Sequence, residues 1–392
     1  MWPLLPLPET IAVFLVTVAV AVAALAVFPR GAWRTRLAWT AAAPAGVTAL
    51  GLSLWATGSP TFAGRGVWLS WHVLILLAPL AVSLLPSAVL ARLSLRAAPA
   101  APPPERGRTS APRRSTRRDL LGGVAALIPV STLGGGVRGL DNASAPQRIP
   151  IVRMRYPDLH PDLEGLRILQ LSDLHLGAAM RAPDLEALLE RAAALEPDLI
   201  VLTGDVADDL HELEEALRIV ARYRPRLGVF AALGNHEYLH DIGATRPIYE
   251  KSAVPLLVDR GVTLGVGAAT LYLAGADDPI DKGEPRRFLA EAVARCAAGA
   301  PGDAFRLLLC HRPEGFIPAS AHGFHLTLSG HTHGGQVGLL GVSAFQPLLP
   351  EQFLWGAYQR GGSRLYTTSG FGHWFPFRVG CPTEAPLIVL GR

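Results

Sequence analysis

The sequence predicts a layered α/β domain that follows an all-α transmembrane region. Three observations lead to this fold class. Long uncharged apolar runs fill the first third of the chain, short β-like runs alternate with helical stretches after Ala145, and five of the β-like runs end in residues that bind metals. The 392 residues therefore divide into a membrane part and a domain at 146–392.

Charge is divided along the chain as unevenly as the apolar residues. The first 140 residues hold 13 arginines, no lysine and three acidic residues, a net charge of +10, so the remainder carries −6 of the chain's total of +4. A basic face on the C-terminal domain has no support, and nucleic acid is not an expected partner. Cys296, Cys310 and Cys381 are too few and too scattered for a disulfide framework or a cysteine-based zinc site.

Residues 1–91 are expected to form three transmembrane helices. Residues 11–28 are an unbroken apolar run, close to the ~20 residues with which a helix spans a bilayer. Two further runs follow at 37–57 and 67–90. Tryptophans fall near the ends of these runs, as in the aromatic belts at membrane interfaces.

A basic loop and a fourth apolar run precede the domain. The loop at 92–119 is proline-rich and holds eight arginines, the composition of a disordered cytoplasmic segment. Residues 120–137 carry no charge, but Pro129 and several glycines make this run the weakest span. A cleaved or surface-lying segment, with a twin-arginine-like signal at Arg117-Arg118, is the alternative. Arginine placement predicts a multi-pass cell-membrane protein whose catalytic domain lies outside the cytoplasm.

Five β-like runs form the framework expected for the domain. They are LRILQLSD at 166, DLIVLTGD at 198, LGVFAALG at 227, FRLLLC at 305 and FHLTLSG at 324. Between them, apolar residues recur at helical spacing at 185–192 and at 213–220. Strands that alternate with amphipathic helices are typical of a layered α/β fold.

Each of these runs leads into candidate metal ligands, where open α/β sheets place their sites. In chain order the motifs are Asp173-Leu174-His175, Gly204-Asp205-Val206-Ala207-Asp208, Gly234-Asn235-His236-Glu237, the lone His311, and Gly330-His331-Thr332-His333. Asp, Asn and neutral His offer oxygen and nitrogen donors that suit Mn, Fe or Zn, and one carboxylate can bridge two ions. One such motif alone is usually a turn with a capping carboxylate, whereas five in order indicate a dinuclear site.

The motifs D-x-H, G-D-x-x-D, G-N-H-E, a lone H and G-H-T-H resemble those of the calcineurin-like metallophosphoesterase family, in its membrane-associated bacterial branch. The resemblance runs from about residue 150 to the C-terminus and does not cover the membrane part. It implies a four-layer α/β/β/α sandwich of two packed mixed sheets, rather than a single doubly wound sheet. It also implies a metal-dependent phosphoric ester hydrolase with two divalent metal ions.

The resemblance gives each motif residue a role. One ion would be bound by Asp173, His175 and His333, the other by Asn235, His311 and His331, with Asp205 bridging both. His236 would face the scissile phosphate as an acid or charge stabiliser and would not be a ligand. Asp208 and Glu237 are expected to have supporting roles.

Such a site can hydrolyse a phosphate ester without a covalent enzyme intermediate. Two ions about 3.5–4 Å apart hold a phosphate oxygen and lower the pKa of a bound water, which gives hydroxide for in-line attack. His236 can protonate the leaving alkoxide, a contribution of about 10²–10⁴-fold. His373, Trp374, Phe375 and Arg378 are candidates for a substrate wall, with Arg378 bound to a second phosphate. An ordinary packed loop is the alternative for this segment.

The leading interpretation is a membrane-anchored phosphodiesterase or phosphomonoesterase that acts on an envelope or lipid-linked phosphate ester, because a tethered site meets such substrates most readily. One alternative is a UDP-2,3-diacylglucosamine-type pyrophosphatase of lipid precursor synthesis on the cytoplasmic side. Another is a non-enzymatic metal-binding membrane sensor, against which the intact His236 argues. The sequence does not define the oligomeric state.

Overall fold

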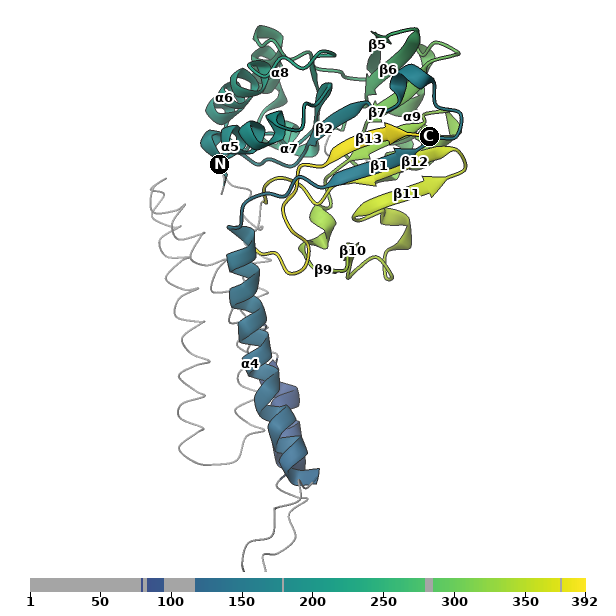
Figure 1. Cartoon of the computed structure of the whole chain (residues 1–392). Helices are drawn as coiled ribbons and strands as arrows, with labels where there is room; N and C mark the ends of the chain where they lie inside the picture. Colours follow the sequence, from purple (N-terminus) through teal and green to yellow (C-terminus); the bar gives the residue numbers. More distant parts are fainter. Residues whose placement is uncertain (1–78, 80–82, 95–116, 178–179, 279–284, 374–375) are drawn as a thin grey trace, which may run out of the picture. The chain divides into compact units, whose positions relative to one another are not determined.

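The computed structural model describes residues 79, 83–94, 117–177, 180–278, 285–373 and 376–392 (Figure 1). The chain divides into two compact units, Trp2–Leu140 and Asp141–Arg392. The spans predicted at 11–28 and 37–57 lie outside the described residues, as do most of the third span and most of the basic loop. The unit that begins at Asp141 contains the whole segment expected to form the α/β domain.

Helix α4 (Arg117–Ala143) contains the apolar run at 120–137. It is one continuous helix with Pro129 in its interior, although proline removes one helical hydrogen bond. Its segment Asp119–Ala143 is long and apolar enough to cross a membrane, by length and composition. Large apolar side chains such as Leu127 and Val130 are exposed along it. Among the described residues it is the one helix of this kind, and Ser83–Ser94 is a shorter apolar helix.

The first sheet of the domain has the strand order β1-β13-β2-β3-β4. Its strands are β1 (Ile151–Arg155), β2 (Arg167–Leu171), β3 (Leu199–Thr203), β4 (Val229–Ala232) and β13 (Leu387–Gly391). The C-terminal strand β13 lies between β1 and β2, parallel to β1 and antiparallel to β2. The other pairs, β2 with β3 and β3 with β4, are parallel, so the sheet is mixed.

The second sheet has the order β11-β12-β8-β7-β6-β5. Its strands are β5 (Arg260–Val266), β6 (Ala269–Gly275), β7 (Phe305–Leu309), β8 (Leu326–Ser329), β11 (Gly356–Arg360) and β12 (Ser363–Thr367). Antiparallel pairs at both edges enclose parallel pairs in the centre. A separate two-stranded hairpin, β9 (Gly338–Leu339) and β10 (Val342–Ser343), stands apart from both sheets.

Helices cover the outer face of each sheet. They are α5 (Ala182–Ala193), α6 (Leu210–Ala221), α7 (Asn235–Leu239), α8 (Ile242–Lys251), α9 (Pro285–Ala298) and α10 (Phe316–Ala321), with short 3₁₀ helices η1 (Pro161–Leu163), η2 (Pro313–Gly315), η3 (His333–Gln336) and η4 (Pro350–Gln352). Helix α6 begins where the Asp209 side chain accepts hydrogen bonds from the amides of His211 and Glu212. Its buried residues include Leu213 and Leu217, at the predicted helical spacing.

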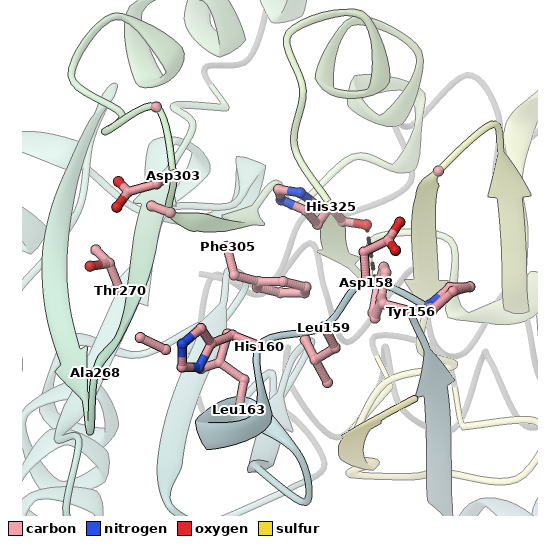
Figure 2. Close-up of a pocket in the computed structure, with 15 residues that line it drawn as sticks. Tyr156, Asp158, Leu159, His160, Leu163, Ala268, Thr270, Asp303, Phe305 and His325 are labelled. Atoms are coloured by element: carbon pink, nitrogen blue, oxygen red, sulfur yellow. Dashed lines mark hydrogen bonds between the residues drawn. The ribbon is translucent and has the colours of Figure 1, made fainter.

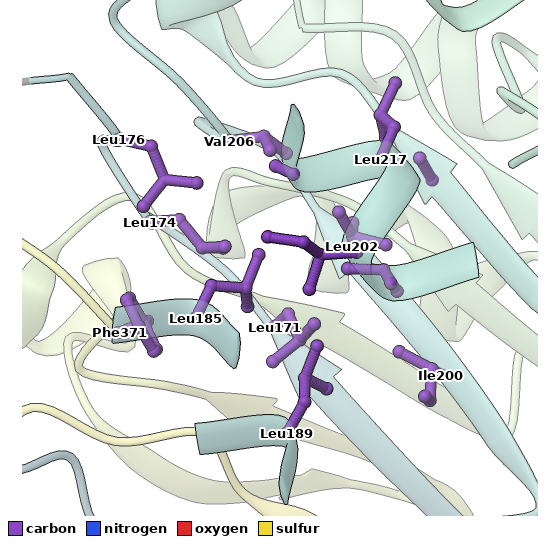
Figure 3. Close-up of a cluster of buried hydrophobic side chains, with 14 of the residues drawn as sticks. Leu171, Leu174, Leu176, Leu185, Leu189, Ile200, Leu202, Val206, Leu217 and Phe371 are labelled. Atoms are coloured by element: carbon purple, nitrogen blue, oxygen red, sulfur yellow. The ribbon is translucent and has the colours of Figure 1, made fainter. Parts of the chain in front are cut away.

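Three apolar clusters hold the layers together. Leu185, Leu202 and Leu217 belong to the cluster between the first sheet and helices α5, α6 and α8 (Figure 3). A second cluster fills the space between the sheets, and a third joins the second sheet to α9 and α10. Adjacent residues alternate between clusters, since Ile200 packs toward the helices and Val201 toward the other sheet. The predicted four-layer α/β/β/α sandwich is confirmed.

The site lies where the two sheets meet. All five predicted strands are present as β2, β3, β4, β7 and β8. Gln170 on β2 is fully buried, and its Nε2 donates to Thr203 Oγ1 and to the carbonyl of Ser329, both at 3.0 Å. These bonds join the carboxyl ends of β3 and β8 across the sandwich. The loops that follow both sheets are thereby brought to one place.

Candidate metal centre

Asp173, His175 and His333 form the first ligand group. Asp173 and His175 follow β2, and His333 follows β8. One donor atom from each side chain lies within 4.8 Å of the others, and all three residues are buried. His333 Nε2 is 3.2 Å from His175 Nε2 and 3.4 Å from Asp173 Oδ1. The structure thus brings together the three side chains predicted to bind one ion.

Asp205, His311 and His331 form the second group, which follows β3, β7 and β8 and again fits within 4.8 Å. Asp205 Oδ2 lies 3.1 Å from His311 Nε2 and 3.8 Å from His175 Nε2. A single carboxylate oxygen therefore lies between the two groups, the position that a bridging ligand requires. Asn235, also predicted for this group, adjoins Asp205 because the amide of the next residue donates to Asp205 Oδ1 at 2.8 Å.

The donor atoms of both groups fit divalent metal ions. Among the described residues, Asn235 Oδ1 and His311 Nε2 are buried without a hydrogen-bond partner. His311 Nε2 also lies 3.1 Å from Asp205 Oδ2. Buried polar atoms are rarely left in this state, and metal coordination would satisfy both. Carboxylate, amide and imidazole donors suit Mn, Fe or Zn.

The histidines are oriented by bonds from their other ring nitrogen. His311 Nδ1 lies 2.7 Å from the carbonyl oxygen of Thr203, and His175 Nδ1 lies 3.2 Å from Asp208 Oδ1. Each Nδ1–H donates to its oxygen, so the lone pair of each Nε2 is left for a ligand bond. This arrangement is common around protein metal ions, where such partners fix the tautomer and the ring.

Two acidic side chains make the centre attractive to cations. Burial disfavours a charge on His311, but Asp205 and Asp173 outweigh this effect and raise its pKa to about 10. Burial in turn lowers the pKa of His331 to about 3, assisted by the neighbouring His311. The carboxylates therefore draw positive charge into the centre, which is a proton on His311 when no metal ion is bound, whereas the low pKa keeps His331 neutral.

Five of the predicted ligands have left-handed backbone. Their φ angles are 53° at Asp173, 46° at His175, 51° at Asp205, 68° at His331 and 49° at His333. Non-glycine residues seldom adopt this region, and each such residue costs about 1–3 kcal/mol. Backbone bonds between the loops hold two of them, since Asp173 and His175 donate to the carbonyls of Gly204 and Asp205, both at 3.1 Å. Strained backbone that clusters in this way is a mark of functional sites.

His236 and Asp208 form a network beside the ligand groups. Asp208 Oδ1 lies 2.8 Å from His236 Nδ1, 3.2 Å from His175 Nδ1 and 3.2 Å from His240 Nε2. One carboxylate therefore bonds the rings of His236 and His175 and adjoins the ring of His240. The supporting role of Asp208 stays a prediction. His240 was not predicted, although its i+4 spacing from His236 places both on one helix face and could have indicated it.

Glu237 joins two of the loops that carry ligands. Its carboxylate accepts hydrogen bonds from the amides of Asp205 at 3.0 Å, Val206 at 2.8 Å and Gly234 at 2.7 Å. The residue is buried. Glu237 therefore fixes the backbone that places Asp205 and Asn235.

We expect Glu237→Gln to destabilise the fold, because an amide offers one acceptor oxygen where three amides now share two. The expected loss is about 2 kcal/mol or more. For a domain of this size, about 2 kcal/mol corresponds to a fall in Tm of roughly 4–8 °C. Thermal unfolding of the purified chain measures the effect, with Glu214→Gln on the exposed face of α6 as the matched control. Equal Tm values for the two variants would contradict this role.

Comparison with known proteins agrees with the metal centre that the geometry indicates. Residues 166–335 match the family model for calcineurin-like phosphoesterases. An uncharacterized metallophosphoesterase of Aquifex aeolicus is 31% identical over 180 residues, which cover 45% of this chain and 67% of that protein. The chain belongs to the calcineurin-like phosphoesterase family.

Other relatives are likewise named as metallophosphoesterases or as proteins with a metallophosphoesterase domain. An uncharacterized metallophosphoesterase of Campylobacter jejuni is 31% identical over 64% of this chain and 65% of that protein. A transmembrane protein with metallophosphoesterase domain from Danio rerio is 30% identical over 68% of this chain and 62% of its own length. The matches thus span slightly less than two thirds of these two relatives. The solved 5′-nucleotidase precursor of Thermus thermophilus aligns with a TM-score of 0.37 and 17% identity, over 54% of this chain and 49% of that one.

Arg378 does not occupy the substrate-facing position predicted for it. The side chain is fully buried, and its Nη1 donates to the carbonyl of Ser369 at 2.7 Å and its Nη2 to that of Gly372 at 2.6 Å. Nη2 also lies 3.1 Å from His333 Nδ1. Arg378 therefore holds the 369–373 loop against a predicted ligand. His373 is likewise buried, and Trp374 and Phe375 lie outside the described residues.

A cavity of about 670 Å³ lies at the other end of the second sheet (Figure 2). It is lined by residues at the starts of β6 and β7, among them Thr270 and Phe305, whereas the metal centre follows the ends of such strands. His325 lines it, stacks on Phe305 with ring centroids 4.8 Å apart, and accepts a hydrogen bond from the Arg306 amide at 3.0 Å. His325 therefore packs into the wall of this cavity, which is separate from the metal centre.

Proposed function

We propose that this chain is a membrane-anchored phosphoric ester hydrolase with a dinuclear metal centre, acting on an envelope or lipid-linked phosphate ester. The observation that carries the proposal is the position of Asp205 between two ligand groups. Its Oδ2 lies 3.1 Å from His311 Nε2 and 3.8 Å from His175 Nε2. Membership of the calcineurin-like phosphoesterase family supports the same reaction class.

The residues of the centre would have separate roles in hydrolysis. Two divalent ions, when bound, would hold phosphate oxygens and lower the pKa of the attacking water. Asp205 would set the spacing of the two ligand groups. His236, whose Nδ1 is held by Asp208 at 2.8 Å, has its Nε2 available to donate a proton to the leaving oxygen.

Activity of the purified full chain tests this function directly. We expect hydrolysis of p-nitrophenyl phosphate or bis-p-nitrophenyl phosphate in the presence of Mn²⁺, loss of that activity with a chelator, and recovery when Mn²⁺ or Zn²⁺ is restored. The physical reason is that the carboxylates and imidazoles alone supply no nucleophile of sufficient strength. Metal binding without turnover of either ester would favour the non-enzymatic sensor.

Several features support a substrate at the membrane. Helix α4 is a candidate membrane helix that leads directly into the domain. Relatives from Danio rerio and Bos taurus are themselves named transmembrane proteins with a metallophosphoesterase domain. An anchored site meets lipid-linked esters at a higher local concentration than soluble ones.

We further propose that α4 crosses the membrane and that the domain lies outside the cytoplasm. The eight arginines between 92 and 118 support this orientation, since basic residues beside a span favour the cytoplasmic side. A phosphatase reporter fused at Ala145 is expected to be active, because such a reporter works only after export. An inactive phosphatase reporter at Ala145, together with an active β-galactosidase reporter at the same position, would reverse the orientation and favour the pyrophosphatase of lipid precursor synthesis.

A further inference from the structure

An unusual apolar surface follows the last metal-ligand motif. In the segment 338–349, Leu339 is 73% exposed, Leu340 93% and Leu348 76%. Val342, Phe345 and Leu349 are also exposed. The segment contains no charged residue. Contiguous apolar surface of this kind is rare on soluble proteins and marks a surface that meets another apolar phase.

The first part of the segment, residues 338–343, is a built hairpin rather than a loose loop. Strands β9 and β10 pair antiparallel, with Leu339 opposite Val342. The two turn residues, Leu340 and Gly341, have φ of 52° and 81°. Both angles are positive, as in the two-residue turns that join twisted antiparallel strands. Glycine fits such a turn freely, whereas a leucine there is strained, so the most exposed side chain of the hairpin occupies an unfavourable backbone position.

The hairpin is tied to the metal centre at its base. The Gly338 amide donates to the carbonyl of Val379 at 2.8 Å, and the Ala344 amide donates to that of Val337 at 2.8 Å. A Cβ placed at Gly335, two residues after His333, would lie 2.7 Å from the Phe345 ring. The apolar segment therefore packs directly on the turn that carries a predicted ligand.

The same base adjoins the end of the candidate membrane helix. Asn142, in the last turn of α4 and within the domain unit, donates from Nδ2 to the carbonyl of Arg378 at 3.0 Å. The next residue, Val379, pairs with Val337 at the start of the hairpin. One short segment of chain thus contacts both the end of α4 and the hairpin.

We propose that the apolar segment 338–349, which begins with the hairpin, inserts into the lipid bilayer that α4 is proposed to cross and holds the metal centre at the membrane surface. Leucine and phenylalanine without charges enter the apolar side of a membrane interface, and α4, which leads into the domain, supplies the second attachment that stable binding needs. Resting on the proposed function, this identifies the substrate class as a phosphate ester in a lipid headgroup. Insertion itself does not depend on catalysis.

Depth of insertion can be measured in the full chain reconstituted in phosphatidylcholine vesicles. The native Cys296, Cys310 and Cys381 are buried, so Leu340→Cys can be labelled selectively with a polarity-sensitive fluorophore. Asp303→Cys, exposed before β7 at the opposite end of the second sheet, is the control.

We expect the fluorophore at position 340 to be quenched by doxyl-labelled lipids and protected from iodide, and the fluorophore at position 303 to show neither effect. Equal iodide quenching at both positions overturns the proposal. Protection without doxyl quenching also overturns it, since a second protein copy would then cover the hairpin.

A substrate comparison tests the consequence for catalysis. We expect Leu339→Gln/Leu340→Gln to lower hydrolysis of phosphatidic acid in phosphatidylcholine vesicles by about tenfold or more, since each 1.4 kcal/mol of lost insertion is tenfold. Turnover of soluble p-nitrophenyl esters is expected to stay unchanged. Ile151→Gln, an exposed apolar position on β1, is the matched control.

Equal losses of activity of the Leu339→Gln/Leu340→Gln variant on phosphatidic acid and on the soluble esters overturn the substrate assignment. Absence of any turnover by the unmodified chain refutes the proposed function, while the depth measurement still decides insertion.

Discussion

Replacement of Asp205 by Asn is expected to remove nearly all phosphoesterase activity and to lower the metal content. Asp205 Oδ2 lies near nitrogens of both ligand groups, and Oδ1 accepts the His236 amide at 2.8 Å. Asparagine keeps the shape but removes the charge and one acceptor oxygen. Since metal ions stabilise the transition state by several kcal/mol, we expect a loss of roughly 10³-fold or more.

Metal analysis and turnover should be measured together for Asp205→Asn and for Asp208→Asn. Asp208 contacts one ring nitrogen each of His175, His236 and His240. Its replacement should therefore disturb the orientation of these rings and leave both ions bound. The activity of Asp208→Asn is therefore expected to fall less. Similar mild effects in the two variants would refute the bridging assignment of Asp205.

Replacement of His236 by Ala is expected to leave metal content unchanged and to slow turnover by about 10²–10⁴-fold for esters with poor leaving groups. An alkoxide requires a proton as it departs, whereas p-nitrophenolate is stable without one. The loss should therefore be much smaller for p-nitrophenyl esters. Comparing kcat for an alkyl and a p-nitrophenyl ester measures this difference.

His240→Ala is the matched control for this experiment. His240 contacts the same Asp208 oxygen at 3.2 Å but has no predicted contact with the phosphate. Its removal should affect both leaving groups alike and only mildly. If His236→Ala also slowed both esters by the same factor, His236 would be a positioning or electrostatic residue and not the proton donor.

The sequence predicted those parts of the fold that depend on local pattern. The five strands that end in ligand motifs are all present, because short, nearly continuous apolar runs with neighbouring glycines are visible in short windows. The insertion of β13 between β1 and β2 was not predicted. That pairing joins residues more than two hundred positions apart, and its partner depends on tertiary packing rather than on local composition.

In the site, too, the residues that belong to local motifs were predicted, whereas a residue whose position depends on tertiary packing was not. Asp173, Asp205 and His331 could be named from motifs, since each ligand directly follows a strand. Arg378 could not be placed, because an arginine near a histidine-rich loop can face a phosphate or a set of backbone carbonyls. The packing that buries it decides between the two, and the sequence does not show that packing.

The left-handed backbone at the ligands also has an evolutionary consequence. At Asp173, His175 and His331, glycine or asparagine would fit the φ angle with less strain, so selection for stability alone would replace these residues. Only continued selection for metal chemistry can maintain them. A duplicated copy freed from that selection should drift toward glycine and asparagine at these positions before its apolar core changes.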